Sequence, residues 1–396
     1  MYTRYALRAQ ATSAPPARPV ATTARPAAGR DAGGATGPAT GHGTGHATAP
    51  SSADRPPVAR RFPARRADPV ASCGVSQLRI ATFNLLHGQP LAPDGSPLDL
   101  PPTAEDPLAE AIAGLDADVL AIQEVDRYQE RSGLVDQAAV AAKAMGAADW
   151  RFAAALHGRP APVAGWVQDR PVGGLQVYGP GEVGTATDLP SYGTALLTRL
   201  PVHHWRARRF APAPFGLPLR VAGRRGLTPV PDEPRAALAA VLEGERGPFT
   251  VVAAHLSFVP GWNMAQLAGI RRWIADLPQP YLVLGDFNLI GAVPRTVLGG
   301  ATALERSGPR RIRELRAARR ARPVLAEPRR RRVREPRARL QGWHDLARIP
   351  TYPSHRPAVQ FDHVLAVGVP RDAVGASLAP RTAVSDHRPL VVEVGL

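Results

Sequence analysis

Acid, amide and imidazole side chains recur in this sequence at the ends of apolar, strand-like runs. Six short segments show the arrangement, at residues 83–85, 122–125, 254–257, 284–288, 361–363 and 385–389. Because strand ends are rigid supports, they can hold reactive groups in a fixed geometry. Carboxylates, amides and histidines that converge from several strands are what a divalent-metal phosphodiesterase requires.

The segment at residues 282–288 carries the sharpest signal. An apolar run ends in Gly285, and Asp286 and Asn288 follow two positions apart, so both side chains face the same way if the strand continues. The carboxylate of Asp286 can bind a metal or take a proton, and the amide of Asn288 can donate to a phosphate oxygen. The structural alternative is a Gly-Asp turn closed by a side-chain hydrogen bond.

Asp386 and His387 stand directly before the last apolar run of the sequence. Imidazole titrates near neutrality and can activate water, so this pair is consistent with an acid–base site. Asp362 could accept a hydrogen bond from the imidazole of His387 and so fix its tautomer. A surface turn is the alternative interpretation of the Asp-His pair.

Glu124 ends a buried run, where a carboxylate is costly unless it is paired or bound to a metal. A hard oxygen ligand suits Mg²⁺ or Mn²⁺, whereas the alternative is an exposed salt bridge at a strand end. His255 could contact phosphate or protonate a leaving group, or it could be a satisfied core histidine. Asn84, on the first strand, is ambiguous in the same way.

Hydrophobic periodicity predicts the elements that would position these groups. Apolar residues recur with helical spacing over residues 104–116 and 262–277, and the second of these places Met264 and Leu267 on or near one apolar face. Residues 137–145 are also expected to be helical. Residues 157–190 are rich in Gly and Pro and are expected to be loop-like. Strands are expected at residues 78–86, 118–125, 194–200, 236–242, 249–256, 281–284, 361–367 and 389–394.

Composition narrows the class of protein. The chain has 396 residues, of which 44% are hydrophobic, enough for a sizeable core. Its one cysteine, Cys73, excludes an internal disulfide and a cysteine-based metal cluster. No Gly-x-Gly-x-x-Gly follows the first strand and no phosphate-binding Gly-Lys-Ser/Thr loop occurs, which disfavours dinucleotide and nucleoside triphosphate sites.

The net charge of +16 is unevenly distributed. Residues 1–77 carry +7 and residues 301–340 carry +11, which leaves about −2 for the part that holds the six segments. We expect a disordered Ala/Pro/Arg-rich tail at residues 1–76 and one catalytic domain at residues 78–396 with a basic insertion at residues 301–340. Binding of these Arg-rich segments to a nucleic-acid backbone is the alternative to solvated disorder.

Targeting and membrane segments are not indicated by the sequence. No stretch approaches the ~20 apolar residues that span a bilayer, and the N-terminal region lacks the continuous apolar run of a standard secretory signal. A cytoplasmic location without a transmembrane segment is therefore expected.

Together, in this order and spacing, the six segments resemble the endonuclease/exonuclease/phosphatase superfamily. Residues 192–199 resemble the central strand of that family, and Arg235 resembles its arginine before the following strand. The resemblance covers residues 78–396 apart from residues 301–340. It implies an α+β fold of the DNase I-like type, a four-layer αββα sandwich in which two packed mixed β-sheets are flanked by helices.

The resemblance also implies a metal site. Glu124 and Asn84 would lie at a bound Mg²⁺ or Mn²⁺, and Asp386 would be a further acid that contacts the metal or water. Departures from the family pattern occur at Phe361-Asp362-His363, where Ile-Asp-Tyr is frequent, and at Gly193-Thr194, where Gly-Asn is commoner. Neither departure removes a catalytic group.

The remaining roles follow from the same resemblance. Asp362 would pair with His387, which would be the general base, and Asp286 and Asn288 would handle the phosphate and the nucleophile. His255 matches the second histidine of the DNase I-like and sphingomyelinase-like branches.

These features predict a monomeric, metal-dependent hydrolase of phosphodiester or phosphomonoester bonds that needs no protein partner. Nucleic acid, phospholipid and small phosphoesters all suit such a site. The alternative is a non-catalytic module on the same fold that binds nucleic acid or protein.

Overall fold

The computed structural model describes residues 76–98, 105–161, 165–167, 174–182, 189–219, 225–305 and 342–396. The expectations for residues 1–75 and 306–341, which include most of the tail and of the basic insertion, lie outside the described residues.

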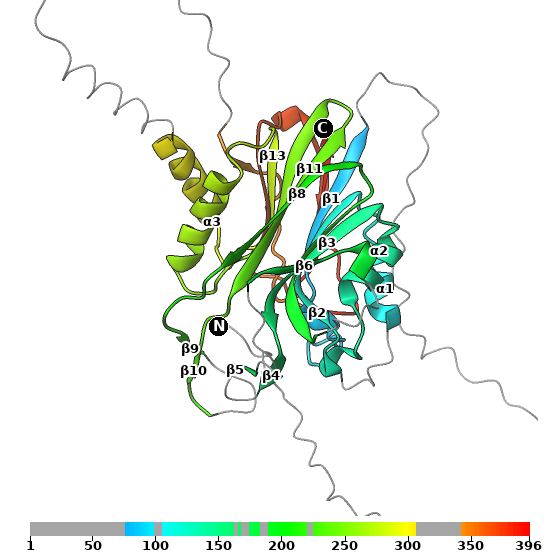
Figure 1. Ribbon diagram of the computed structural model, residues 1–396, viewed down its shortest axis with the longest axis vertical. Coiled ribbons are helices and arrows are strands. Elements are labelled where there is room, and N and C mark those ends of the chain that lie inside the picture. Colours follow the sequence, from blue (N-terminus) through cyan, green and yellow to red (C-terminus); the bar gives the residue numbers. More distant parts are fainter. Residues whose placement is uncertain are drawn as a thin grey trace, which may run out of the picture. The chain divides into compact units, whose positions relative to one another are not determined.

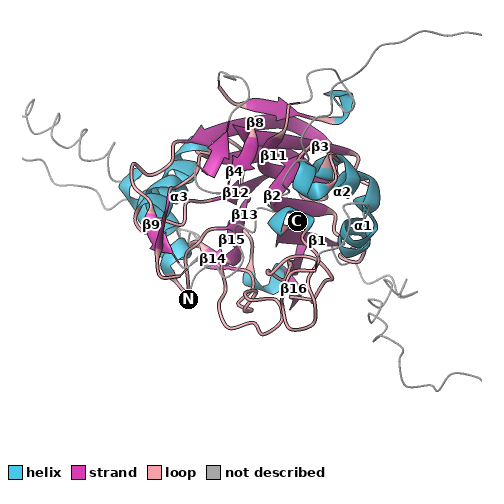
Figure 2. Ribbon diagram, turned by 90° about the horizontal axis from the view of Figure 1, so that it is seen from below, coloured by secondary structure: helices cyan, strands magenta, loops and turns pink. Residues whose placement is uncertain are grey.

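Two β-sheets pack face to face, with helices on both outer sides (Figure 1). Seen from below, α1 and α2 flank one sheet and α3 flanks the other (Figure 2). The fold is the expected four-layer α+β sandwich.

The first sheet places the first and the last long strands of the domain side by side. β1 pairs with β17 in antiparallel fashion and with β2 in parallel fashion. The seven strands, in spatial order, are β16 (Val374–Leu378), β17 (Leu390–Gly395), β1 (Gln77–Asn84), β2 (Val119–Arg127), β7 (Ser191–Thr198), β3 (Asp149–His157) and β6 (Gln176–Tyr178).

The second sheet has six strands. Two of them, β12 and β13, pair in parallel fashion. In spatial order the strands are β14 (His344–Asp345), β15 (Asp362–Val367), β13 (Tyr281–Asp286), β12 (Gly247–His255), β11 (Arg235–Gly244) and β8 (Val202–Phe210). Two short hairpins stand apart from the sheets, β4 (Arg159–Ala161) with β5 (Gly165–Val167) and β9 (Leu217–Leu219) with β10 (Thr228–Val230).

Three apolar clusters hold the layers together. The central cluster joins the inner faces of the two sheets and includes Ile80, Leu238 and Leu284. A second cluster packs the first sheet against α1 (Glu105–Ala113) and α2 (Gln137–Met145). A third packs the second sheet against α3 (Trp262–Trp273) and the helical residues 293–305. Burial of apolar surface on both faces of each sheet is the main favourable term in folding.

The predicted strands and helices that carry the six segments are present, with ends that shift by a few residues. α2 spans the expected residues 137–145, because Asp136 accepts a hydrogen bond from the Ala139 N–H at its start and Gly146 takes a left-handed conformation at its end. α3 ends at Trp273, before the expected residue 277. Met264 is 40% exposed and does not share the buried face of α3.

The expectation that residues 157–190 form only loop is wrong in part. This stretch holds the β4–β5 hairpin and β6. Two long strands, β3 and β8, were also not predicted, nor were the short β14 and β16. No helix in the described part of the chain is long and apolar enough to cross a membrane.

Candidate active site

Six polar side chains at or near strand ends, one of them in a β-bulge, meet at one end of the sandwich. The parallel pairs β1–β2 and β12–β13 direct their carboxyl ends to this side, and the register pairs His255 with Asp286 and Asp286 with Asp362. Neighbouring strands therefore deliver the groups to one place. They are Asn84 at the end of β1, Glu124 in β2, His255 at the end of β12, Asp286 at the end of β13, Asp362 at the start of β15 and His387 before β17.

A β-bulge in β2 places Glu124. The register with β7 shifts between Ile122 and Val125, and Glu124 has a φ of +54°, a left-handed conformation that is uncommon for a residue with a side chain. Gln123 is fully buried, while Glu124 is only partly buried. The bulge thus re-aims the carboxylate within an otherwise buried strand.

Asn84 joins two carboxylates. Its amide Nδ2 donates to Glu124 Oε1 and to Asp286 Oδ2, each at 3.0 Å. Its amide oxygen accepts from the Leu86 N–H at 3.0 Å, which fixes the orientation of the amide. In this arrangement Asn84 holds Glu124 and Asp286 in place and turns its oxygen away from them.

His387 is held from both sides. Its Nδ1 lies 2.8 Å from Asp362 Oδ2, the same oxygen that accepts from the Thr351 hydroxyl at 2.6 Å. Its Nε2 lies 3.9 Å from Asp286 Oδ2. Tyr352 packs against the imidazole with ring centroids 5.0 Å apart. The ring is therefore oriented with Nδ1 toward Asp362 and Nε2 toward the other carboxylates.

Ser385 fastens this segment to the first strand. Its hydroxyl donates to the Asn84 backbone oxygen at 2.6 Å and accepts from the His387 N–H at 3.0 Å. Ser385 has a φ of +71°, so the backbone is in the left-handed region here as well. The side chain couples the position of His387 to that of Asn84.

His255 approaches from the second sheet. Its Nε2 lies 3.8 Å from Asp286 Oδ2, and Arg235 Nη1 lies 3.1 Å from its Nδ1. Burial, then the charges of Arg235 and His387, lower the pKa of His255 well below its usual value. This shift favours the neutral form of the imidazole.

Asn288 follows the strand but does not continue its geometry. The strand ends at Asp286, and Asn288 has a φ of +49°. The Asn288 N–H donates to Asp286 Oδ1 at 2.9 Å, and its side-chain amide donates to the Leu256 backbone oxygen at 3.0 Å. Because the strand does not continue to Asn288, the side chains of Asp286 and Asn288 are not on the same face of a strand. Asn288 instead fixes the orientation of Asp286.

Three acids at this site have raised pKa values. Burial raises the pKa of Glu124, and it raises the pKa of Asp286 and of Asp386 to about 6. Burial acts to lower the pKa of His387, but neighbouring carboxylates, Asp362 foremost, outweigh it and raise the value to about 10. Negative charge is therefore concentrated here, and the site favours cations.

The donor set fits a hard divalent cation. Carboxylate oxygens of Glu124 and Asp386 are the ligand type that Mg²⁺ prefers, and their raised pKa values reflect acids that a cation would stabilise. Among the described residues no group of three or more His, Cys, Asp or Glu side chains is arranged as a metal cage. Mg²⁺ is usually held by one or two carboxylates with water and substrate in the other positions. The charge of Glu124 acts on Asp386, so the two acids fit that ion in type and number.

Sequence reasoning missed several residues that shape the site. Thr351 and Ser385 act through single hydroxyl hydrogen bonds, for which no spacing pattern exists. Trp166 and Glu233 lie in Gly- and Pro-rich stretches, and they meet only because the chain folds the indole Nε1 to within 2.7 Å of Glu233 Oε1. A tryptophan beside a glycine in a stretch otherwise without aromatic residues was the one available signal.

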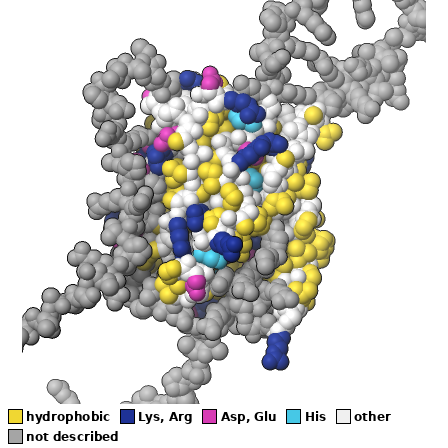
Figure 3. Space-filling model, turned by 180° about the vertical axis from the view of Figure 1, so that it is seen from behind, with side chains coloured by type: hydrophobic (Ala, Val, Ile, Leu, Met, Phe, Trp, Pro, Cys, Tyr) yellow, Lys and Arg dark blue, Asp and Glu magenta, His cyan; other side chains and the backbone are white. Residues whose placement is uncertain are grey.

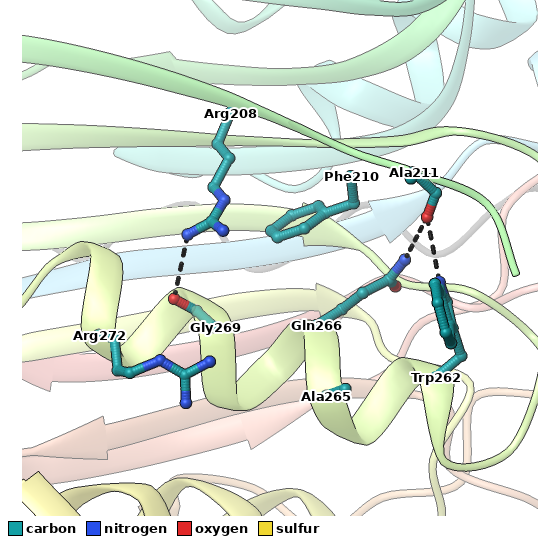
Figure 4. A pocket seen from close by; sticks show the side chains of 8 residues that line it. All are labelled: Arg208, Phe210, Ala211, Trp262, Ala265, Gln266, Gly269 and Arg272. Atoms are coloured by element: carbon teal, nitrogen blue, oxygen red, sulfur yellow. Dashed lines mark hydrogen bonds between the residues drawn. The ribbon is translucent and has the colours of Figure 1, made fainter.

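A separate hollow of about 200 Å³ lies between β8 and α3 (Figure 4). Trp262 and Gln266 donate to the Ala211 backbone oxygen, and Arg208 donates to the Gly269 backbone oxygen. The lining is mostly apolar and contains no carboxylate or imidazole. The hollow therefore lacks the groups for acid–base chemistry.

Comparison with known proteins gives one family and several similar solved structures. The model of the Endonuclease/Exonuclease/phosphatase family matches residues 81–387. No curated protein matches the sequence. Among solved structures, an endonuclease/exonuclease/phosphatase from Beutenbergia cavernae is 18% identical, with a TM-score of 0.44 over 81% of this chain and 72% of that chain. One from Bacteroides vulgatus is 15% identical, with a TM-score of 0.45 over 81% and 99%. A mannosyl-6-phosphatase from Bacteroides thetaiotaomicron is 13% identical, with a TM-score of 0.40 over 81% and 100%.

Proposed function

The chain belongs to the endonuclease/exonuclease/phosphatase family, and on that premise we propose that it is a divalent-metal-dependent phosphoesterase that hydrolyses phosphodiester or phosphomonoester bonds. The observation that carries the proposal is the meeting of Glu124, Asp286 and the His387–Asp362 pair at one end of the sandwich. A carboxylate-rich pocket beside an oriented imidazole is suited to the attack of water on a phosphate ester.

His387 is the general base in this proposal. Asp362 accepts from Nδ1 at 2.8 Å, which leaves Nε2 as the nitrogen that takes a proton from the attacking water. A base must be neutral before it acts, and carboxylates hold the pKa of His387 at about 10. Compensating part of that negative charge would lower the pKa toward the range in which imidazole acts as a base.

Mg²⁺ or Mn²⁺ would be the compensating charge. Enzymes of this family are in general dependent on a divalent metal, and Glu124 and Asp386 would hold the ion here. When bound, the ion would polarise the phosphate and stabilise the negative charge that develops in the transition state. Asn84 keeps Glu124 in position through the hydrogen bond to its Oε1.

Asp286 and its neighbours would orient the phosphate and the nucleophile. Asp286 lies within 4 Å of the Nε2 atoms of both His255 and His387, so it stands between the two imidazoles. His255 would donate to a phosphate oxygen. Asn288 would support this part of the site by its backbone hydrogen bond to Asp286 Oδ1.

The substrate class is phosphate esters, among them nucleic acids, phospholipids and small phosphoesters. On the face seen in Figure 3, the described arginines form separate groups with apolar and uncharged surface between them. A protein that binds duplex DNA along its length presents a more continuous basic face. This view gives no support to the alternative of a nucleic-acid-binding module without catalysis, and the presence of every expected acid and base favours an enzyme.

A substrate panel tests the proposal. The full chain is assayed on plasmid DNA, RNA, sphingomyelin and bis(p-nitrophenyl) phosphate, each with Mg²⁺, with Mn²⁺ and with EDTA. We expect metal-dependent turnover of at least one substrate, and loss of that turnover in His387→Ala. Absence of turnover on every ester, or turnover that persists in EDTA, would refute a metal-dependent phosphoesterase.

A further inference from the structure

Large apolar side chains are exposed at the end of the sandwich that holds the candidate site, here called the site end. Leu98 and Leu134 lie in the connections that follow β1 and β2. Met264 lies in the first turn of α3, beyond the end of β12, and Ile290 lies in the connection that follows β13. Because these strands direct their carboxyl ends to the site, the exposed side chains stand on segments that border it.

Two hairpins add apolar side chains to the site end. β4–β5 follows β3 and β9–β10 follows β8, so both hairpins lie at the end of the sandwich away from the C-terminus (Figure 1). Phe215 precedes β9 and is 58% exposed, and Leu227 precedes β10 and is 62% exposed. Val167, the last residue of β5, is also exposed. Together with the four side chains of the connections, these three form what we call the apolar rim.

The opposite end of the sandwich differs in this respect. Residues 114–118, 199–201 and 274–280 form turns there, and no large apolar side chain within these three described ranges is exposed. The remaining exposed ones, Val177 and Leu304, lie on β6 and on the helical residues 293–305. Single exposed apolar residues are ordinary on any protein surface, but random scatter would not favour one end. The asymmetry therefore indicates a contact surface at the site end.

Polar contacts anchor the segments that carry the apolar rim. Trp166, beside Val167, donates from its indole Nε1 to Glu233 Oε1 at 2.7 Å. Asp232 Oδ2 accepts from the Ala213 N–H at 2.7 Å, two residues before the exposed phenylalanine. Both acids belong to the connection that leads into β11. The apolar side chains thus stay in water although the chain on either side of them is fixed, a cost that a binding partner would remove.

Arginines near the site are paired with acids. Arg131 donates to both carboxylate oxygens of Asp126, each at 2.8 Å. Arg159 Nη1 lies 3.6 Å from Glu130 Oε1. A nucleic-acid backbone is held by cations that are free to replace its counterions, and an acid beside each cation would repel it. These pairs disfavour nucleic acid as the partner of the site end.

A lipid surface fits the apolar rim. Its acyl region accepts apolar side chains from separate segments, whereas a folded protein partner requires one continuous complementary patch. Arg225 is exposed and stands two residues before Leu227. A basic group beside an apolar one suits the boundary between phosphate headgroups and acyl chains.

We propose that the site end docks on a lipid surface by inserting the apolar rim between phospholipid headgroups, which brings the phosphate esters of assembled phospholipids to the candidate site. The rim surrounds the ends of β1, β2 and β13, so a docked molecule faces the surface with Asn84, Glu124 and Asp286. Docking requires no catalysis. The choice of phospholipid as the substrate, by contrast, rests on the proposed phosphoesterase function.

Vesicle flotation tests docking without any turnover. The full chain is mixed with phosphatidylcholine vesicles at about 0.5 M NaCl, where exposed charges are largely screened and the Arg-rich segments contribute little. We expect the wild-type chain to float with the vesicles. The double variant Phe215→Ser, Leu227→Ser should partition about tenfold less or weaker still, because it removes two of the most exposed apolar groups of the rim.

Leu304→Ser is the matched control, because Leu304 is 73% exposed and does not belong to the apolar rim. It should float as the wild type does, and circular dichroism checks the fold of each variant. An equal loss in the control, or a wild-type chain that binds only phosphatidylserine vesicles and is released by salt, would overturn the proposal.

Fluorescence quenching tests the orientation of the docked chain. Phe215→Trp and Leu304→Trp each add one tryptophan, and their emission is compared with that of the wild-type chain, which has six. Lipids brominated on the acyl chains should quench the added emission of Phe215→Trp and leave that of Leu304→Trp unchanged. Equal quenching of both would show that the site end does not face the lipid.

The same double variant decides between lipid and other partners. Loss of plasmid DNA retention, or conversion of a dimer into a monomer in light scattering, with no change in flotation, would assign the rim to nucleic acid or to a second copy of the chain. Either result would overturn the proposal.

Turnover of a short-chain phosphatidylcholine below and above its critical micelle concentration tests the consequence for the substrate. The wild-type rate should rise when micelles form, and the double variant should lose this rise but keep its rate on soluble bis(p-nitrophenyl) phosphate. If the chain floats with vesicles but hydrolyses no ester, the proposed function fails and docking stands. If it hydrolyses soluble esters but binds no vesicle, the function stands and docking fails.

Discussion

At the scale of single residues, the site contains groups whose backbone conformation or burial lowers the free energy of unfolding. Glu124 takes a left-handed backbone conformation within a bulge, and burial raises its pKa. Burial also raises the pKa values of Asp286 and Asp386. Groups held in conformations or environments that cost free energy gather at functional sites. The residues that matter most for the reaction should therefore contribute least to folding.

Glu124→Gln should separate the two properties. Gln keeps an oxygen for the Asn84 amide but removes a partly buried negative charge, so the melting temperature should stay the same or rise. Turnover should fall by about a hundredfold or more, because the carboxylate that we propose as a metal ligand is lost. Calorimetry and a steady-state assay on the same preparation measure both quantities. A variant that melts lower and keeps its turnover would contradict the assigned role.

Asp362→Asn should disable His387 without moving it. The amide still fits between Thr351 and His387, but it can no longer stabilise a positively charged imidazole or enforce its tautomer. Loss of the equivalent carboxylate in catalytic triads costs about 10⁴ in kcat, and we expect a loss of about 10³ or more.

Thr351→Val is the control for this variant. It removes the second hydrogen bond to the same Asp362 oxygen but leaves the contact with His387 intact, so turnover should fall by less than about tenfold. Circular dichroism on both variants checks the fold. Equal losses in the two variants would show that packing around Asp362, and not its charge, is what matters.

At the scale of elements, close approach of β12 and β13 brings His255 beside Asp286. Gly285 has a φ of +146°, and a Cβ on it would lie 1.7 Å from the Ala254 backbone oxygen. No side chain can occupy that position without moving one of the two strands. The site therefore depends on a glycine that performs no chemistry.

Gly285→Ala should lower the free energy of unfolding by more than about 3 kcal/mol. Gly299→Ala is the matched control, because it lies in the helical residues 293–305 and a Cβ there would meet nothing within 4 Å. The control should be more stable than the wild type by about 0.5–1 kcal/mol. Urea denaturation of the three proteins measures the differences, and a similar stability for both variants would refute the role of the close approach.

The sequence predicts those elements whose burial pattern is simple. Each strand that carries a residue of the candidate site was predicted, because it is a run of buried apolar residues with a polar group at or near its end. β8 was missed because it is an edge strand with exposed His203, His204 and Arg208, so it lacks an apolar run. β3 was missed because its Ala-rich sequence does not favour a strand.

The site was predicted as a set of residues but not as a geometry. Nothing in the spacing of Asp286 and Asn288 shows that the chain turns at Asn288, because the left-handed conformation depends on contacts with Leu256 and Asn263 from other segments. The contact of Arg235 with His255 depends on how the two side chains pack, which the sequence does not specify. Long-range contacts decide these details.

At the scale of the whole molecule, metal binding should be linked to stability. A ligand that binds only the folded state stabilises it by about 2.7 kcal/mol at a hundredfold excess over its Kd. Thermal unfolding of the wild-type chain should therefore shift to higher temperature as Mg²⁺ is added, and EDTA should reverse the shift. Glu124→Gln should show a smaller shift. The same shift in both proteins would place the metal elsewhere.

The position of β17 in the first sheet has a consequence for biosynthesis. β17 (Leu390–Gly395) lies between β16 and β1, so β1 gains its second neighbour only after the ribosome has added the final residues of the sheet. Until then the nascent polypeptide carries an unpaired, apolar strand edge, which is the kind of surface that associates with other chains. A translation product that stops before this point would lack both β17 and His387. Quality-control machinery would then act on an inactive, aggregation-prone chain rather than on a partly active enzyme.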